Sequence, residues 1–358
     1  MSLLLTVIVR HITNKMDSNT NKQAGDGEHV GDGSISPAYF SASMRRHYLH
    51  SMVQSLPEPI QQRVTVLKNL QLEISNIEKK YDEEIFKIEK KYQEKFQPLY
   101  IKRMEIITGK VDPPEEQPKW KETKPEEEVE VNGDFGDILK TCQSIPADAT
   151  GVPYFWLIVF KTCDKLRELI HPEDEQVLKS LYDLKMVYHE DLSYTFEFHF
   201  TENDYFTNNV LYKTYYLRTT SDDFPFHYDS LELYKCKGCD INWKENKDLT
   251  SRKITTGDGE NRVEHFIPND TFFNFFKPPE AEVGSEELDE KTDDILSTDF
   301  EVSYLIREEI IPRAVLYFTG DLVCDDSDEE SDSESEAEYP SYYDECGGEG
   351  TNVGKYNQ

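Results

Sequence analysis

Apolar residues between Pro57 and Leu99 recur every three or four positions, which places them on one face of a helix. The positions between them are mostly Glu, Lys and Asp, so the other faces are charged. A helix of about 40 residues is ~60 Å long at ~1.5 Å per residue. The pattern predicts a long helix over 56–108, with a kink near Pro98. Its apolar stripe contains Ile60, Val64, Leu67, Ile74, Ile77, Tyr81, Ile85, Ile88 and Tyr92.

A stripe of this length has to be buried by a surface of matching length. The chain contains no second long segment with the same period, so the same helix in a second copy is the simplest partner. The alternative is that the chain folds back over its own stripe. We expect a homodimer in which these nine residues form the dimerisation face.

The sequence changes character after the predicted helix. Prolines and a run of Glu indicate an acidic linker over 109–135, and a helical pattern follows up to Leu181. Four runs then alternate between apolar and polar residues, with short connections that favour an antiparallel sheet. They are Leu184–Tyr188, Tyr194–Phe200, Leu211–Leu217 and Leu231–Tyr234.

Two further helical segments complete the predicted domain. An aromatic segment over 269–277 begins with Asn269 and Asp270, either of which can cap a short helix. A last helical region runs from Ile295 to Val315 and is interrupted at Pro312. The fold class is therefore α+β: the long helix, then an α+β domain over 136–322 with an antiparallel sheet. Residues 1–55 and 323–358 are expected to be disordered termini, because their composition is polar and aperiodic.

The charge of the chain is strongly negative. Its 71 acidic and 39 basic residues give a net charge of −32, which attracts cationic partners and disfavours direct binding to nucleic acid. Solubility alone is the other explanation of such acidity. Residues 325–349 hold twelve acids and no base, which is typical of a solvated interaction tail.

The acidic tail supplies most of the candidate binding residues. Aromatic side chains beside the acids can anchor in apolar pockets of a basic partner. The candidate contacts are Asp325, Asp326, Asp328, Glu329, Glu330, Tyr343, Asp344 and Glu345. Four serines have an acid three residues later, a pattern that suits acid-directed kinases, and phosphorylation would add negative charge. They are Ser327, Ser331, Ser333 and Ser335.

No motif indicates catalysis, a metal or a cofactor. Cys236 and Cys239 have the spacing of half a zinc site, but the chain has no second pair with metal-ligand spacing. No nucleophile elbow or HExxH motif occurs. The apolar run Leu3–Val9 is too short to cross a bilayer, which takes ~20 residues. We expect neither an enzyme nor a membrane protein.

Six stretches, in order, resemble the nucleosome assembly protein family of histone chaperones, with similarity from about Leu56 to Asp321. The first three are Leu67-Lys-Asn-Leu-Gln, Gly151-Val-Pro-Tyr-Phe-Trp-Leu and Phe196-Glu-Phe-His-Phe-Thr-Glu-Asn-Asp-Tyr-Phe-Thr-Asn. The others are Cys236-Lys-Gly-Cys-Asp-Ile-Asn-Trp, Asn269-Asp-Thr-Phe-Phe-Asn-Phe-Phe-Lys-Pro-Pro-Glu and Ile311-Pro-Arg-Ala-Val-Leu-Tyr-Phe-Thr-Gly.

The resemblance implies a dimer built on the long helix, with an earmuff-like α+β domain and a helical underside at each end. It implies that an acidic concave face and acidic tails bind the histone 2A–2B dimer and the histone 3–4 tetramer. It also implies nucleosome assembly and disassembly without ATP. Glu202 and Asp204, in the loop after Phe200, are the candidate contacts on the folded body.

The chain departs from the family pattern in one segment. Many members carry a strongly basic import segment where residues 244–268 here hold five bases and five acids. This indicates a divergent member found in both nucleus and cytoplasm. The alternative function is an acidic dimeric scaffold or inhibitor of cytoplasmic partner proteins.

Overall fold

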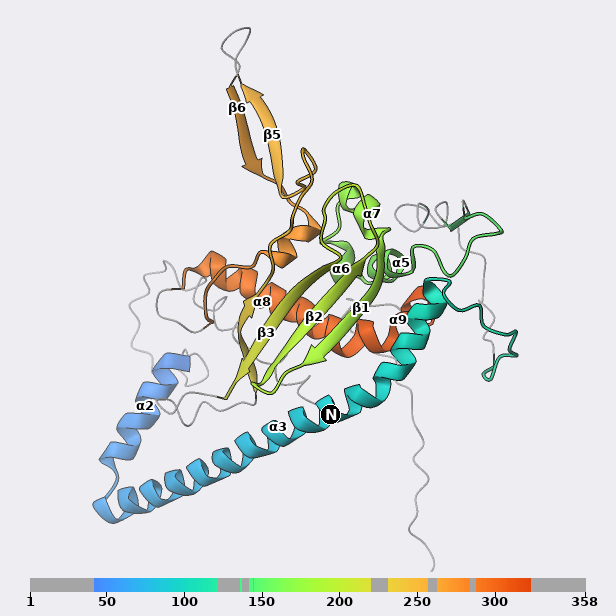
Figure 1. Cartoon of the computed structure of the whole chain (residues 1–358). Helices are drawn as coiled ribbons and strands as arrows, with labels where there is room; N and C mark the ends of the chain where they lie inside the picture. The colour runs from blue at the N-terminus through green and yellow to red at the C-terminus, as the bar shows by residue number, and fades with distance from the viewer. Residues whose placement is uncertain are drawn as a thin grey trace, which may run out of the picture. The chain divides into compact units, whose positions relative to one another are not determined.

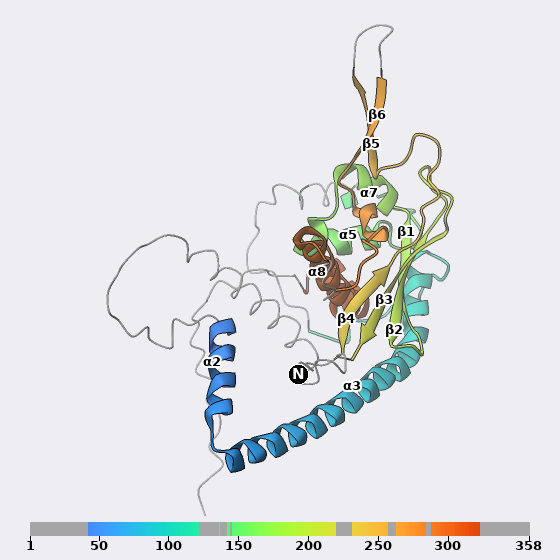
Figure 2. The same ribbon diagram turned by 90° about the vertical axis from the view of Figure 1, so that its left-hand side faces the viewer.

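The computed structural model describes residues 42–121, 136, 142–143, 145–219, 231–256, 263–283 and 288–322. They form an α+β fold: a long helix and an antiparallel sheet with helices packed against one of its faces (Figures 1 and 2). In the described part of the chain no helix is long and apolar enough to cross a membrane. The predicted tail 323–358, all of 1–41 and all of 122–141 except residue 136 lie outside these residues.

Helix α2 (Ala42–Ser55) corrects the expectation that residues 1–55 lack structure. Its 14 residues contain neither Gly nor Pro, and Met44, Tyr48 and Met52 recur at helical spacing. This helical pattern is short and follows the polar, aperiodic residues 1–41, so it was not predicted. Ser55-Leu56-Pro57 separates α2 from the next helix.

Helix α3 (Glu58–Ile107) is the predicted long helix. Its 50 residues correspond to ~75 Å at ~1.5 Å per residue, and its bounds lie within two residues of the predicted 56–108. Pro57 occupies the N-cap, where its missing N–H costs nothing. Pro98 does not end the helix, which continues for nine more residues and bends in its C-terminal part (Figure 1).

Three short helices precede the sheet, where the sequence pattern predicted helical structure. They are α5 (Phe155–Thr162), α6 (Asp164–Arg167) and α7 (Pro172–Leu178). Every residue of α5 is buried, and the indole N–H of Trp156 donates to the Tyr182 carbonyl oxygen at 3.1 Å. Helix α5 is thereby fixed to the first strand of the sheet.

The four-stranded sheet has the order β1-β2-β3-β4 and is antiparallel throughout. All four predicted strands are confirmed, as β1 (Leu181–Tyr188), β2 (Ser193–Phe200), β3 (Val210–Arg218) and β4 (Glu232–Lys237). Alternation places Tyr194, Phe196, Phe198 and Phe200 on the core face. Figure 2 shows α5 and α8 on one side of the sheet.

A separate two-stranded hairpin, β5 (Ser251–Thr256) and β6 (Val263–Pro268), was not predicted. It extends away from the four-stranded sheet in Figure 1. Its strands are mixed in polarity, so they lack the alternation that marked the other four. The exposed Phe266 shows that one of its apolar side chains is left uncovered.

The aromatic segment forms the 3-10 helix η3 (Phe272–Phe276). Its cap is Thr271, not Asn269 or Asp270 as expected: the Thr271 hydroxyl oxygen accepts from the Phe273 N–H. The buried carboxylate of Asp174 accepts from the Thr271 hydroxyl and from the Phe272 N–H, the latter at 2.8 Å. Asp174 of α7 holds Thr271 in the capping position. Because it lies far away in the sequence, the spacing of residues around η3 does not indicate this contact.

The last helical region starts earlier than predicted, and it is interrupted beside Pro312, as predicted. Helix α8 (Glu290–Leu305) begins at the N-cap Asp289, the π-helix η4 (Ile306–Ile310) follows, and α9 (Ile311–Thr319) completes the region. Pro312 lies in the first turn of α9, and the non-helical backbone is at Arg313. A π-turn before a proline accommodates the missing N–H.

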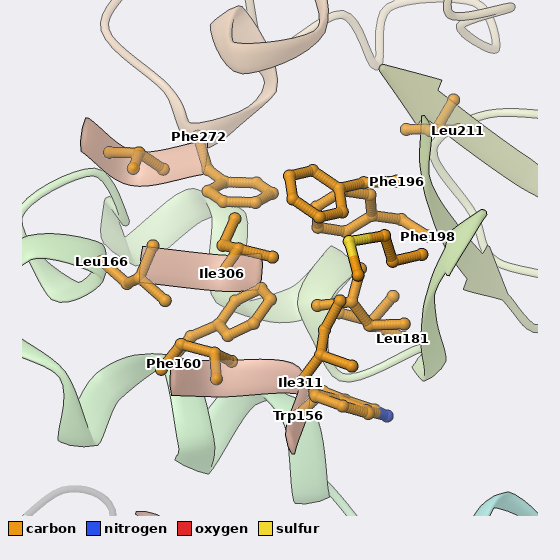
Figure 3. Close-up of a cluster of buried hydrophobic side chains, with 14 of the residues drawn as sticks. Trp156, Phe160, Leu166, Leu181, Phe196, Phe198, Leu211, Phe272, Ile306 and Ile311 are labelled. Carbon is orange, nitrogen blue, oxygen red and sulfur yellow. The ribbon is translucent and has the colours of Figure 1, made fainter. Parts of the chain in front are cut away.

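The core lies between the sheet and these helices. Aromatic and aliphatic side chains from β2, α5, η3 and α9 meet there, including Phe196, Phe160, Phe272 and Ile311 (Figure 3). Gly238, just after β4, is part of this packing. A Cβ atom at this position would lie 1.8 Å from the Phe276 carbonyl oxygen, so only glycine fits.

A buried ion pair crosses the core. The Lys213 ammonium on β3 donates to Asp299 Oδ1 of α8 and to the Phe275 carbonyl oxygen, each at 2.5 Å. The Cys236 thiol donates to Asp299 Oδ2 at 3.0 Å. Burial lowers the pKa of Lys213, and the charge of Asp299 opposes this effect. The network holds α8 and η3 on the sheet.

Polar contacts also fix α3 to the domain. Glu89 of α3 pairs with the buried Arg307 of η4, and Arg103 donates to the Ile311 carbonyl oxygen at 2.6 Å. Phe86 packs edge-on against Tyr188, with ring centroids 5.1 Å apart. Phe86, Glu89 and Arg103 all lie in the C-terminal half of α3.

Candidate functional site

The loop between β2 and β3 presents the two acids that were predicted on the folded body. Glu202 and Asp204 are both exposed. Between them, the Asn203 side-chain oxygen accepts from the Tyr205 N–H at 2.9 Å and the Phe206 N–H at 3.1 Å. This side-chain turn fixes the backbone that carries the carboxylates.

A second segment holds the same loop from the other side. The Thr207 N–H donates to the Asn242 carbonyl oxygen at 3.0 Å, and the Lys244 ammonium donates to the Asn203 carbonyl oxygen at 2.6 Å. Phe206 is buried against Trp243. Glu202 and Asp204 are therefore displayed on a well-anchored loop, where a partner can contact them with little ordering cost.

The helical side of the domain carries a larger group of acids that was not predicted as a site. Residues 289–310 contain eight acids and two bases. Several of these residues form ion pairs within the chain: Asp299 with Lys213, Glu301 with Lys165, Glu308 with Arg307 and Glu309 with Arg313. The acids other than Asp299, at least partly exposed, are Asp289, Glu290, Asp293, Asp294, Glu301, Glu308 and Glu309.

A predicted helix that began at Asp289 would have included all of these acids. The apolar Leu296, Phe300 and Val302 are buried. Asp289, Glu290 and Asp294 are exposed, and the other acids are partly exposed. The predicted helical region begins at Ile295 and so excludes the acidic first turn of α8. Acids in the first turn are also favoured there by the helix dipole.

The predicted dimerisation stripe on α3 is largely uncovered within one chain. Of its nine residues, Ile60, Leu67, Ile74, Ile77, Tyr81, Ile88 and Tyr92 are exposed, and Val64 and Ile85 are partly buried. Leu67, Ile77 and Tyr81 have exposed fractions of 63%, 68% and 62%. The stripe is carried by a different element from the β2–β3 loop, so these two surfaces are separate.

The other predicted site residues lie outside the described residues. These are the acidic and tyrosine contacts Asp325, Asp326, Asp328, Glu329, Glu330, Tyr343, Asp344 and Glu345, and the serines Ser327, Ser331, Ser333 and Ser335.

The two cysteines of the CxxC sequence have separate roles in packing. Cys236 is buried and donates to Asp299, and burial raises the pKa of its thiol. Cys239 accepts a hydrogen bond from the Tyr212 N–H at 3.2 Å. Among the described residues, no group of three or more His, Cys, Asp or Glu side chains is arranged to hold a metal ion.

Comparison with known families agrees with the resemblance in the sequence. The family model described as nucleosome assembly protein matches residues 62–321. The chain belongs to the nucleosome assembly protein family. The match covers almost all of α3, the sheet, both acidic surfaces of the folded body and the helices up to α9. This family consists of histone chaperones.

Individual family members cover most of the chain. Nucleosome assembly protein 1-like 1 of Xenopus tropicalis is 42% identical over 291 residues, which are 77% of this chain and 73% of that protein. Nucleosome assembly protein 1-like 4 of Homo sapiens is 39% identical over 299 residues, 79% of this chain and 80% of that protein. The solved nucleosome assembly protein 1 of Plasmodium knowlesi is 24% identical, with a TM-score of 0.48, covering 75% of this chain and all of that chain.

Proposed function

We propose that this chain is a dimeric histone chaperone that binds the histone 2A–2B dimer and the histone 3–4 tetramer and promotes nucleosome assembly and disassembly without ATP. The family match over 62–321 carries the proposal. The net charge of −32 supports it, because a cationic partner is attracted to such a protein.

The mechanism is competition between two polyanions for one basic surface. Carboxylates of α8, η4 and the β2–β3 loop face the basic histone surface that DNA would otherwise cover. The tail from Asp325 to Glu345 adds further contacts and raises the encounter rate. Because this exchange only shifts a binding equilibrium, it needs neither a catalytic step nor ATP.

The exposed stripe of α3 supports the dimer. An uncovered apolar surface of this length is rare in a monomeric protein. Two copies of α3 would bury both stripes at once. The contacts of Phe86 and Glu89 with the chain's own domain use an adjacent face of the helix, so both interactions can coexist.

Binding to the histone 2A–2B dimer should be tight at low salt and weaken steadily as salt rises, because salt screens exposed charges. Deletion of 323–358 should weaken binding about tenfold, which is ~1.4 kcal/mol, because the acids of the folded body remain. Fluorescence titration with labelled histone dimer at several salt concentrations measures both effects. Absence of binding at low salt would refute the proposal.

The tail deletion also distinguishes histone binding from the alternative, an acidic scaffold or inhibitor of cytoplasmic partner proteins. If the chain instead uses its folded face as a scaffold for cytoplasmic proteins, the tail deletion should leave its affinity for those proteins unchanged.

Residues 244–268 hold as many acids as bases, which supports a distribution between nucleus and cytoplasm. Comparing the location of a fluorescent fusion of the full chain with one carrying an added import signal tests this distribution.

A further inference from the structure

The face of the four-stranded sheet that points away from α5 and α8 contains a shallow groove. Residues of the β1–β2 turn, β2 and β3 line it. Tyr212 is 49% exposed, so the groove is open to solvent. Neither the β2–β3 loop acids nor the acids of α8 contribute to its lining. It is a different surface from those assigned above.

Small hydroxyl side chains form the floor of this groove. Strand pairing places Thr195 opposite Thr214, and their hydroxyl oxygens are hydrogen bonded at 2.8 Å. His189 Nε2 lies 2.7 Å from the Thr195 hydroxyl oxygen. The floor is therefore held by cross-strand bonds and does not need a ligand to form.

Larger side chains form the two ends. Tyr212 and Tyr216 flank Thr214 on the same face of β3, ~13 Å apart at ~3.3 Å per residue. Glu197 is paired with Tyr212, and Ser193 is paired with Tyr216. An extended peptide of about four residues spans this distance.

The groove has a negative lining. Glu190, Asp191 and Glu197 line it, and no lysine or arginine does. Asp191 Oδ1 accepts from the Ser193 hydroxyl at 2.6 Å, and Glu197 Oε2 lies 3.1 Å from His199 Nε2. Lys90 of α3 pairs with Glu190, whose side chain is nevertheless 93% exposed.

Lysines at the borders of the face are mostly paired elsewhere. Lys185, opposite Glu197 on β1, pairs with Asp183 at 3.5 Å. Lys235 on β4 pairs with Glu282 at 3.2 Å, while Lys237 stands opposite Thr214 at the end of the same strand. The most negative end of the groove is thus the β1–β2 turn.

We propose that this groove binds an extended lysine- and arginine-rich peptide segment, such as the flexible tail of a bound basic protein. Carboxylates at both ends attract the cationic side chains, and a cation over the exposed ring of Tyr212 is stabilised by the ring's electrons. The expectation that the peptide is basic rests on the proposed function. The place where it binds is inferred from the groove alone.

Fluorescence anisotropy of a labelled peptide tests the site in the full chain. The probe is a synthetic 12-residue peptide rich in Lys and Arg, at low salt. Glu197→Gln and Tyr212→Ala should each weaken binding about two- to fivefold. Two controls should leave the affinity unchanged. Glu280→Gln makes the same charge change at an exposed site, and Val187→Ala truncates a side chain on the same face outside the groove.

Titration of each variant with the histone 2A–2B dimer distinguishes a failure of the groove proposal from a failure of the proposed histone-binding function. The proposal that the groove binds the peptide would be overturned by any of three results. All variants bind the peptide with the wild-type affinity, the control variants lose as much affinity as the groove variants, or no peptide binding is detected. If any of these occurs while the wild-type chain still binds histone dimers, the proposed function stands and only the groove is wrong. Circular dichroism confirms that each variant is folded.

Discussion

Ile77→Glu combined with Tyr81→Glu should abolish the proposed dimer and leave a monomer. Both residues are more than 60% exposed in one chain and lie in the middle of the α3 stripe. Burial of each apolar side chain contributes about 1.5–3 kcal/mol, and each substitution also places a carboxylate in the interface. A combined loss of at least ~4 kcal/mol raises the dissociation constant about a thousandfold. Sedimentation velocity over a range of concentrations measures this change.

The matched control adds the same two charges to the opposite face of the helix. Thr65 and Asn76 are exposed and lie about 180° from the stripe at 100° per residue. The protein that carries both Thr65→Glu and Asn76→Glu should remain a dimer. If the stripe variant sediments like the wild-type protein, α3 is not the dimerisation element and the stripe is covered in another way.

Periodicity made the α3 helix predictable because a stripe of nine apolar residues over charged faces permits few other structures. The four main strands were predictable for a similar reason, since alternation and short connections specify an antiparallel sheet. Helix α2 and the β5–β6 hairpin were missed. The first has a short pattern beside a polar segment, and the second lacks alternation.

Substitution of Asp299 by Ala should destabilise the domain by about 3–5 kcal/mol, because it leaves the Lys213 ammonium buried and unpaired. Lys213 is only 1% exposed, so water cannot replace the lost carboxylate. The Tyr215 hydroxyl and the Cys236 thiol, which also donate to Asp299, lose their acceptor as well. Urea denaturation at fixed protein concentration measures the change in the free energy of unfolding.

The double variant Asp299→Ala with Lys213→Met is the control for this effect. Removing both charges should cost clearly less than the sum of the two single substitutions, because neither charge is then left unpaired. Additive losses would contradict the assignment of the pair as a buried network. Lys235→Ala with Glu282→Ala, an exposed pair, should change stability by less than about 1 kcal/mol.

The sequence could not reveal this ion pair. Lys213 and Asp299 are 86 positions apart, and each looks like an ordinary polar residue in a strand or a helix. The acids of α8 were not predicted as a group for a different reason, because their grouping depends on where the helix begins. Glu202 and Asp204 were predicted because the family stretch from Phe196 to Asn208 contains both, and the structure adds the anchoring by Asn203 and Lys244.

A competition experiment tests the central claim most directly. Labelled histone 2A–2B dimers are bound to DNA at physiological salt, and the full chain is added in increasing amounts while free DNA and the protein–histone complex are measured. The proposal predicts that DNA is released in step with formation of the complex, without ATP. Histones that stay on DNA at every protein concentration, with no complex formed, would contradict it.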